Sequence, residues 1–251
     1  MRMKIFLLFL LYSFTSIAGS CFLVKEDNKI LKVEGECHKA FAPNSTFKIP
    51  LALMGFDSGI LESEEKPVYP FKKEYDHRIN VCKGDHNPKE WMRDSCVWFS
   101  QVLTKELGLQ KFKAYVEKFN YGNKDVFETD PLSLSWLENS LKITADEQVE
   151  FIQGFLTRKF PLKPKAYELT TKILYQQEMA GGWKLYGKTG NGMYRPDLQQ
   201  GWFVGWIEKG GRKIAFASHI SDESKQDVFA SFRAKNEAIN KLWFVINDIQ
   251  K

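Results

Sequence analysis

Residues 183–220 read WKLYGKTGNGMYRPDLQQGWFVGWIEKGGRKIAFASHI and contain three apolar, aromatic-rich segments separated by turn residues. This pattern predicts strands at Trp183–Gly187, Trp202–Ile207 and Lys213–Ile220. The last two are separated by Lys209-Gly210-Gly211, which favours a tight turn. Consecutive strands joined by tight turns pair in antiparallel fashion. This part of the chain therefore predicts an antiparallel sheet.

Further strands and helices are expected on both sides of this segment. Alternating apolar and polar residues predict two short strands over Phe22–Val33, about a turn at Asp27-Asn28. Helical periodicity is expected over about 45–58, 91–107, 109–119, 144–156 and 227–249. The last helix is expected to pack against an apolar surface through Phe229, Phe232, Leu242, Trp243 and Ile246. The order of elements predicts an α+β fold, with an antiparallel sheet flanked by terminal helices and a helical lobe at about 60–165 inserted between its parts.

The first twenty residues have the pattern of a secretory signal peptide. Arg2 and Lys4 precede an apolar run, Ile5–Tyr12, and a small-residue segment ends at Ala18-Gly19-Ser20. The run is shorter than the roughly 20 residues that span a bilayer. We therefore expect cleavage after residue 20, export to the bacterial periplasm and a single domain over 21–251. Cys21 would then also permit lipid attachment, which we favour less than a freely soluble product.

The composition limits the class of protein. The chain has 251 residues, of which 43% are hydrophobic, so it can bury a large core. Its 36 basic and 31 acidic residues give a net charge of +5, spread along the chain rather than gathered in a block. A nucleic-acid footprint would be concentrated. We therefore expect no nucleic-acid partner.

The cysteines and histidines predict no metal site. In an oxidising compartment one pair of the four cysteines could form a disulfide, and the sequence does not say which pair among Cys21, Cys37, Cys82 and Cys96. His77, Cys82 and His86 lie close together in the sequence, but their spacing fits no standard zinc pattern. We expect them to be polar loop residues.

Ser45-Thr46-Phe47-Lys48 places a hydroxyl and an amine three residues apart, and so on one helix face. A serine hydroxyl becomes a good nucleophile when a neighbour takes its proton, and a lysine can do so if burial or nearby charge keeps it neutral. A helix start would add backbone N–H groups that stabilise an oxyanion. Alone the pattern is weak, because Ser-x-x-Lys usually marks an exposed helix face.

Lys188-Thr189-Gly190 follows the expected strand 183–187. A glycine there would let a substrate lie against the strand edge, and the two preceding side chains could donate to a carboxylate or carbonyl group. The alternative interpretation is a strand end with a solvated lysine and a turn glycine.

Ser95-Cys96-Val97 and Tyr121-Gly122-Asn123 lie between these two motifs. Each is uninformative alone, because the first fits an ordinary helix and the second an ordinary helix stop. In this order, however, the four motifs resemble those of the class D β-lactamases, the oxacillinase type. The resemblance extends from about Ala42 to the last helix and includes Trp136-Leu137-Glu138. It implies the fold shared by serine β-lactamases and penicillin-binding transpeptidases.

The resemblance also implies roles for individual residues. Ser45 would be acylated, Lys48 would carry carbon dioxide as an N6-carboxylysine that acts as base, and Ser95 would relay a proton. Lys188 completes the expected catalytic set. Substrate binding would fall to Thr189, Gly190, Asn191, Arg233, Val97 and Tyr121. The carbamate would be supported by Trp136, Val97 and Leu137. The alternatives are core packing for Trp136 and a solvated helix position for Arg233.

The activity implied is hydrolysis of the β-lactam amide of penicillin-type antibiotics through a serine acyl-enzyme, which gives antibiotic resistance. Carbon dioxide or bicarbonate would be needed to carboxylate the lysine, and no other cofactor. The alternatives are a D-alanyl-D-alanine peptidase or transpeptidase, and a β-lactam sensor that is acylated without turnover. The expected partners are small β-lactam molecules, and the expected state is a monomer or homodimer.

Overall fold

The computed structural model describes residues 19–75, 79–126 and 135–249. Six antiparallel strands form one sheet in the order β2-β1-β6-β5-β4-β3. The strands are β1 (Ser20–Glu26), β2 (Lys29–Gly35), β3 (Tyr175–Met179), β4 (Trp183–Arg195), β5 (Leu198–Lys209) and β6 (Arg212–Ser221). The N-terminal hairpin joins the C-terminal strands because β1 pairs with β6. The expected antiparallel sheet is confirmed.

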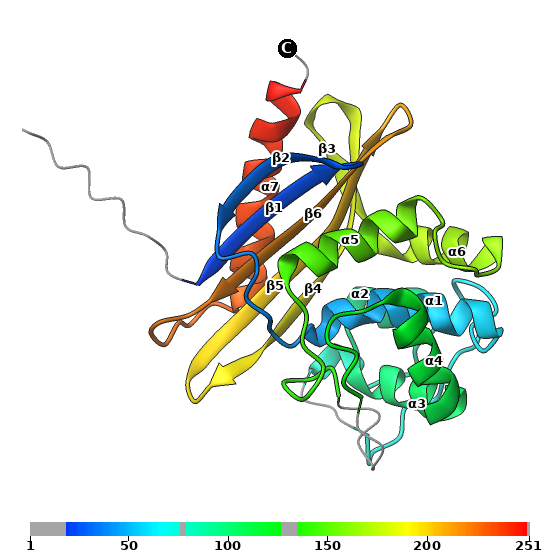
Figure 1. Cartoon of the computed structure of the whole chain (residues 1–251). Coiled ribbons are helices and arrows are strands. Elements are labelled where there is room, and N and C mark those ends of the chain that lie inside the picture. The colour runs from blue at the N-terminus through cyan, green and yellow to red at the C-terminus, as the bar shows by residue number, and fades with distance from the viewer. Residues whose placement is uncertain (1–18, 76–78, 127–134, 250–251) are drawn as a thin grey trace, which may run out of the picture.

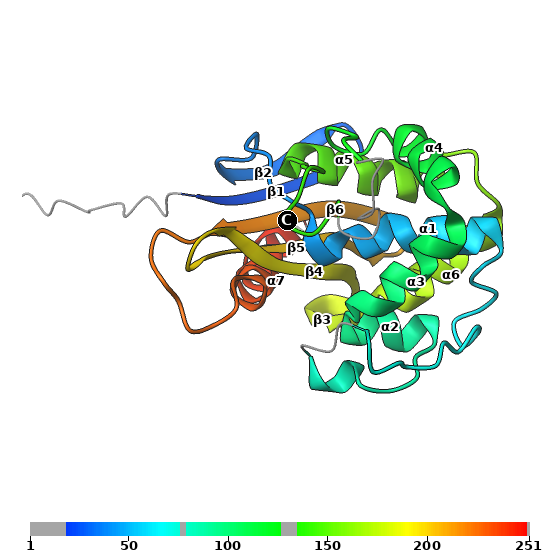
Figure 2. The same ribbon diagram turned by 90° about the horizontal axis from the view of Figure 1, so that it is seen from below.

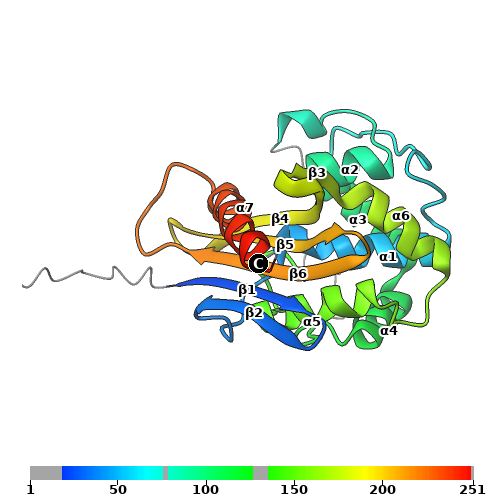
Figure 3. The same ribbon diagram turned by 90° about the horizontal axis from the view of Figure 1, so that it is seen from above.

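Helices cover both faces of this sheet. They are α1 (Lys48–Ser58), α2 (Pro88–Asp94), α3 (Val97–Leu107), α4 (Leu109–Phe119), α5 (Ala145–Leu156), α6 (Pro164–Leu174) and α7 (Ala230–Asp248). The terminal helix α7 lies on one face, whereas α5 lies on the other and α1–α4 and α6 gather beside the sheet (Figures 1, 2 and 3). Two apolar clusters fill the interior, one between α7 and the sheet and one between the sheet and the other helices.

Strand β4 is longer than the sequence predicts. The expected strand ends at Gly187, but β4 continues to Arg195, so Lys188-Thr189-Gly190 lies inside a strand and not after one. Three glycines between residues 187 and 192 make this segment resemble a turn. Residues Lys184 to Arg195 of β4 pair with β5, and this pairing holds the segment extended instead.

The expected helix over 91–107 is two helices. Ser95 has a left-handed backbone (φ 63°), which a right-handed helix cannot accommodate, so α2 ends there and α3 begins at Val97. Helix α6 and strand β3 were not predicted. Pro164 stands at the first turn of α6, where the fixed backbone angle of proline favours the start of a helix.

Helix α7 does not use its aromatic residues to reach the sheet. Three of the five residues expected there are half-exposed: Phe229 (56%), Phe232 (54%) and Trp243 (46%). Leu242 and Ile246 are buried, as expected, together with Ala234 and Ala238. The helix start lies so close to the sheet that a Cβ atom on Gly201 would be 2.1 Å from the carbonyl carbon of Ala230. Only small side chains therefore fit where the helix starts, whereas Leu242 and Ile246 pack on the sheet farther along it.

All four cysteines form disulfides, Cys21–Cys37 and Cys82–Cys96, where only one pair was expected. Because its sulfur is bonded to Cys37, Cys21 has no free thiol for a lipid, which argues against the lipid anchor. His86 is buried (4% exposed) and is not the polar loop residue that was expected. The expected signal peptide and His77 lie outside the described residues, apart from residues 19 and 20. Along the described chain, no helix has the length and apolar character needed to cross a bilayer.

Candidate active site

The nucleophile candidate lies on a short 3-10 turn, Asn44–Phe47, that leads directly into α1. Asn44 has a left-handed backbone (φ 48°), and its N–H donates to the carbonyl of Trp136 (2.9 Å). Thr46 closes the turn, because its hydroxyl donates to the carbonyl of Pro43 (2.7 Å). Ser45 therefore projects from a rigid turn at the start of a helix rather than from the helix itself.

Lys48 is the first residue of α1 and is fully buried. Its Nζ donates to Ser45 Oγ at 3.2 Å. Burial lowers the pKa of this amine well below 10.5, and the nearby charge of Lys188 lowers it further. The site therefore favours an uncharged amine beside the serine, and the alternative of an exposed Ser-x-x-Lys helix face is wrong.

Trp136 lies against the same turn. Its ring stacks on Phe47, with centroids 5.2 Å apart, and its side chain is fully buried. Within the described parts of the chain, its indole Nε1–H has no acceptor. A buried donor without a partner is costly, so the space around this indole is suited to an acceptor group. Val97, at the start of α3, and Leu137 are half-buried.

Strand β4 offers a free edge beside this turn. Strand β3 pairs only with the first residues of β4. Beyond them, Gln176 Nε2 donates to the carbonyl of Gly187 (3.1 Å) and the N–H of Met193 donates to Glu138 Oε1 (2.8 Å), both at that edge. Backbone polar groups of alternate strand residues point the same way. The N–H of Asn191 therefore points to this edge.

The free edge lies directly against the nucleophile turn. A Cβ atom on Gly190 would be 2.7 Å from the carbonyl oxygen of Pro43 and 3.2 Å from the backbone nitrogen of Ser45. No side chain fits in this gap, so glycine is required for the close approach. The backbone of β4 and the backbone nitrogen of Ser45 thus lie close together.

Lys188 projects from β4 into the buried interior, with 4% of its surface exposed. Its Nζ donates to the carbonyl oxygen of Thr189 (3.1 Å) and lies 3.4 Å from that residue's Oγ1. Burial, and then the charge of Lys235, lower the pKa of Lys188 to about 7. The alternative of a solvated lysine at a strand end is wrong.

Ser95 lies at the break between α2 and α3 and is half-buried. Its N–H donates to the carbonyl of Trp91 (2.9 Å). The residue that follows it, Cys96, is fully buried and bonded to Cys82.

Tyr121 does not line the site. It is fully buried, and its hydroxyl donates to Gln148 Oε1 (3.2 Å), while Gln148 Nε2 donates to Thr46 Oγ1 (3.0 Å). Burial raises the pKa of the phenol, so it stays protonated. Its ring meets Phe47 edge-on at 5.2 Å. Tyr121 thus supports the turn from beneath and cannot touch a substrate, contrary to our expectation.

Arg233 is already engaged by the protein. Its guanidinium makes two 2.7 Å contacts with the carboxylate of Asp222, which is 5% exposed, and its Nε donates to the carbonyl of Val228. The expected role of Arg233 in binding a substrate carboxylate stays a prediction, and the carboxylate of Asp222 competes for its guanidinium.

Lys235, which the sequence did not single out, lies nearer to the β4 edge. Its Nζ donates to Gln176 Oε1 (2.7 Å) and lies 5.5 Å from the ring centroid of Phe203. Phe203 pairs with Thr189, so both side chains are on the α7 face of the sheet. In the sequence Lys235 looks like any polar residue of an amphipathic helix, and no signal distinguishes it.

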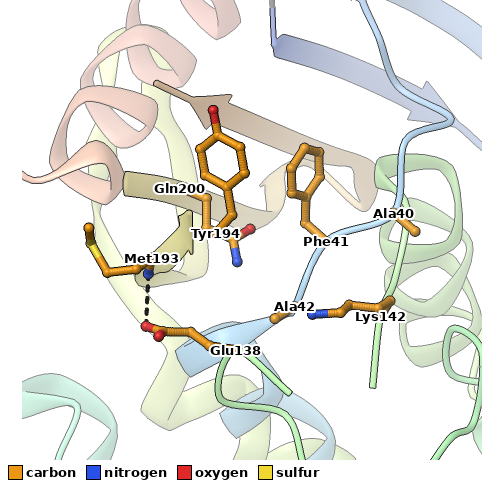
Figure 4. A pocket seen from close by; sticks show the side chains of 8 residues that line it. All are labelled: Ala40, Phe41, Ala42, Glu138, Lys142, Met193, Tyr194 and Gln200. Carbon is orange, nitrogen blue, oxygen red and sulfur yellow. Dashed lines mark hydrogen bonds between the residues drawn. The ribbon is translucent and has the colours of Figure 1, made fainter. Parts of the chain in front are cut away.

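A cavity of about 230 Å³ lies near the far end of the same edge (Figure 4). It is lined by Ala40, Phe41, Ala42, Glu138, Lys142, Met193, Tyr194 and Gln200. Glu138 bridges the cavity and β4 through its bond to the Met193 N–H (2.8 Å). The cavity contains none of the expected catalytic side chains, so it is not the reaction centre.

Comparison with known proteins identifies the family. The family model for the penicillin binding protein transpeptidase domain matches residues 22–243. Beta-lactamase OXA-9 of Klebsiella pneumoniae is 40% identical over 224 residues, which cover 83% of this chain and 80% of the relative. Beta-lactamase OXA-1 of Escherichia coli is 37% identical over 233 residues, covering 88% and 83%.

The solved structures agree with the sequence comparison. The crystal structure of the OXA-427 class D β-lactamase superposes with a TM-score of 0.86 at 36% identity, covering 91% of this chain and 99% of that one. The similarity therefore includes both the sheet and the helices around Ser45 and Lys48. This chain belongs to the class D β-lactamases, which share the penicillin-binding transpeptidase fold.

Proposed function

We propose that this class D β-lactamase hydrolyses the amide bond of penicillin-type antibiotics by acylating Ser45. The observation that carries the proposal is the buried Lys48 amine, 3.2 Å from Ser45 Oγ. The direct test is repeated turnover of a chromogenic β-lactam by the purified chain, with intact-mass spectrometry to detect the acyl-enzyme. A single stoichiometric acylation without turnover would instead favour the transpeptidase or the sensor.

Acylation begins when the Ser45 hydroxyl gives its proton to the Lys48 side chain and attacks the lactam carbonyl carbon. The backbone N–H groups of Ser45 and Asn191 are placed to stabilise the oxyanion. As the C–N bond breaks, Ser95 relays a proton to the departing nitrogen. Water then attacks the ester on Ser45, the Lys48 side chain takes a proton from that water, and Ser45 is regenerated.

We propose that Lys48 is carboxylated by carbon dioxide. An uncharged amine is the form that adds carbon dioxide, and the lowered pKa of Lys48 supports that form. When present, the carbamate supplies an anionic base that an ammonium group could not provide. The unpartnered indole N–H of Trp136 would hold it, with Val97 and Leu137 as apolar neighbours.

Groups along the β4 edge orient the substrate in this proposal. Lys188 and Thr189 would bind the substrate carboxylate, and Gly190 supports this because it lets the edge lie close to Ser45. We assign the additional cation of this subsite to Lys235 instead of Arg233, because Asp222 already neutralises the arginine. Burial is the main cause of the lowered pKa of Lys188, about 7, and the nearby charge of Lys235 lowers it further.

The Lys235→Ala variant is expected to raise KM for a penicillin about tenfold, since a hydrogen bond to a charged group is worth about 1.5 kcal/mol or more. Its kcat should change little, because the residue binds the substrate without reacting. Steady-state kinetics with a penicillin would measure both constants. Arg233→Ala is the matched control on the same helix and should leave KM within about a factor of two or three, because its guanidinium is already engaged by Asp222. A larger KM change in Arg233→Ala than in Lys235→Ala would reverse the assignment.

The Trp136→Phe variant is expected to weaken carbon dioxide uptake by Lys48 about 10- to 100-fold, the value of one hydrogen bond to a charged group. The carbamate signal in ¹³C NMR, titrated with labelled bicarbonate, would measure this directly. Trp206→Phe is the control, since Trp206 is also buried with an unpartnered indole N–H but packs on Tyr186 in the sheet. Equal bicarbonate dependence in the two variants would contradict the role of Trp136.

We also propose that the chain is exported to the periplasm by a signal peptide cleaved after residue 20. Two disulfides support an oxidising compartment, because such bonds are rare in the bacterial cytosol. We predict that the mature protein is a monomer or a homodimer.

A further inference from the structure

The residues around Ser95 are tied to a distant loop. Cys96, which follows Ser95, forms a disulfide with Cys82 in the 3-10 turn Asn80–Cys82. The carbonyl of Cys82 also accepts a hydrogen bond from the indole of Trp98 (2.9 Å). The loop is therefore attached to the first turn of α3 at two points.

A buried histidine strengthens the same junction. His86 Nε2 lies 3.3 Å from Cys96 Sγ and 3.3 Å from Asp94 Oδ2, and its Nδ1 lies 2.7 Å from the carbonyl of Gly84. Asp94 and Cys96 are the two neighbours of Ser95. Both contact the 82–86 loop through their side chains, whereas Ser95 itself is held by its backbone bond to α2.

The backbone of Ser95 needs this support. A left-handed conformation (φ 63°) is unfavourable for a serine and persists when the surrounding structure holds it. The disulfide and His86 fix the chain on both sides of that residue. The second disulfide, Cys21–Cys37, joins β1 to the segment after β2 and flanks no catalytic residue.

We propose that Cys82 and Cys96, supported by His86, are positioning residues that hold the Ser95 hydroxyl where it can relay a proton. Opening the disulfide releases the α2–α3 junction and slows proton delivery to the lactam nitrogen. This inference rests on the proposed role of Ser95.

The opening reaction balances with a trialkylphosphine as reductant. The phosphine attacks one sulfur and the S–S bond breaks; water then supplies the oxygen of the phosphine oxide and the two protons of the thiols. The disulfide gains two electrons and the phosphine loses two. A thiol oxidant reverses the change.

The test compares two double variants. Cys82→Ala/Cys96→Ala should acylate with a penicillin about 10- to 100-fold more slowly than the wild type, the cost of displacing a catalytic group by about 1 Å. It should also lose sensitivity to the phosphine. Cys21→Ala/Cys37→Ala should acylate at the wild-type rate, slow down with phosphine and recover on reoxidation. Unchanged acylation in the first variant would overturn the proposal.

A second substrate distinguishes a displaced Ser95 from a general loss of activity caused by a disturbed structure. An acyclic ester with a phenol leaving group needs no proton on the departing oxygen, so its acylation should fall less than about threefold. Equal losses for the ester and the penicillin would overturn the proposal. If the first variant does not fold, the reversibly reduced Cys21→Ala/Cys37→Ala protein gives the same comparison. Ser95→Ala is measured in parallel, and normal penicillin acylation there would reject the role of Ser95 itself.

Discussion

Replacement of Lys48 by alanine is expected to lower the turnover of penicillins by about 10²- to 10⁴-fold, the usual contribution of a positioned general base. The variant removes the only side chain with a hydrogen bond to Ser45 Oγ among the described residues. Hydrolysis of the ester on Ser45 should be slowed as well as acylation, so any acyl-enzyme that forms should persist. Steady-state rates and intact-mass spectrometry after mixing would measure both effects.

Lys142→Ala is the matched control for this variant. Lys142 also has a pKa lowered by partial burial, but it lines the cavity of Figure 4 and lies outside the reaction centre. Its variant should retain wild-type turnover on simple penicillins. Rapid turnover by Lys48→Ala would show that another group serves as the base.

Lys48 also determines how the activity depends on pH and on bicarbonate. Because its pKa is lowered, Lys48 is uncharged above that pKa and takes up a proton as the pH falls through it. The protonated amine cannot add carbon dioxide. Wild-type activity should therefore fall at acid pH and be partly restored by bicarbonate, and Lys48→Ala should show no bicarbonate response.

Replacement of Ser45 by alanine is expected to have the largest effect, a loss of turnover on the order of 10⁶-fold, as for removal of the nucleophile in a serine protease. No covalent adduct should form, even with a β-lactam that the wild type releases slowly. Intact-mass spectrometry would show the unmodified mass after long incubation.

Ser58→Ala is the control on the same helix. Ser58 is the last residue of α1, and its hydroxyl donates to the carbonyl of Gly55 (3.1 Å), so the change leaves the nucleophile turn intact. That variant should acylate normally. An adduct on Ser45→Ala would place the nucleophile elsewhere, with Ser95 the first residue to examine.

Several features were predictable because they depend on residues near one another in the sequence. The pairing of Ser45 with Lys48 follows from helical spacing, and the structure places the two side chains 3.2 Å apart. The helix expected over about 144–156 is α5, which begins at Ala145 after a capping box formed by Thr144 and Glu147. The β5–β6 hairpin follows from two apolar segments and a Gly-Gly turn.

Long-range packing decided the rest of the site. Lys188 is buried because β4 continues through a glycine-rich segment, which only pairing with β5 holds extended. Asp222 lies 11 residues before Arg233 and neutralises it, whereas Lys235 meets Gln176 of a strand that the sequence did not predict. Phe229, Phe232 and Trp243 are exposed because a different face of α7, which carries Ala234, Leu242 and Ile246, packs on the sheet.

The amino-acid order alone thus specified the local periodicity, the nucleophile and its base, and the likeness to a family. Burial, charge neutralisation and the two disulfide pairings came from contacts between residues far apart in the chain. Such contacts depend on how strands and helices are packed in three dimensions, and a low-dielectric interior then shifts the pKa values of Lys48 and Lys188. The reactive state of these lysines is therefore a property of the tertiary structure.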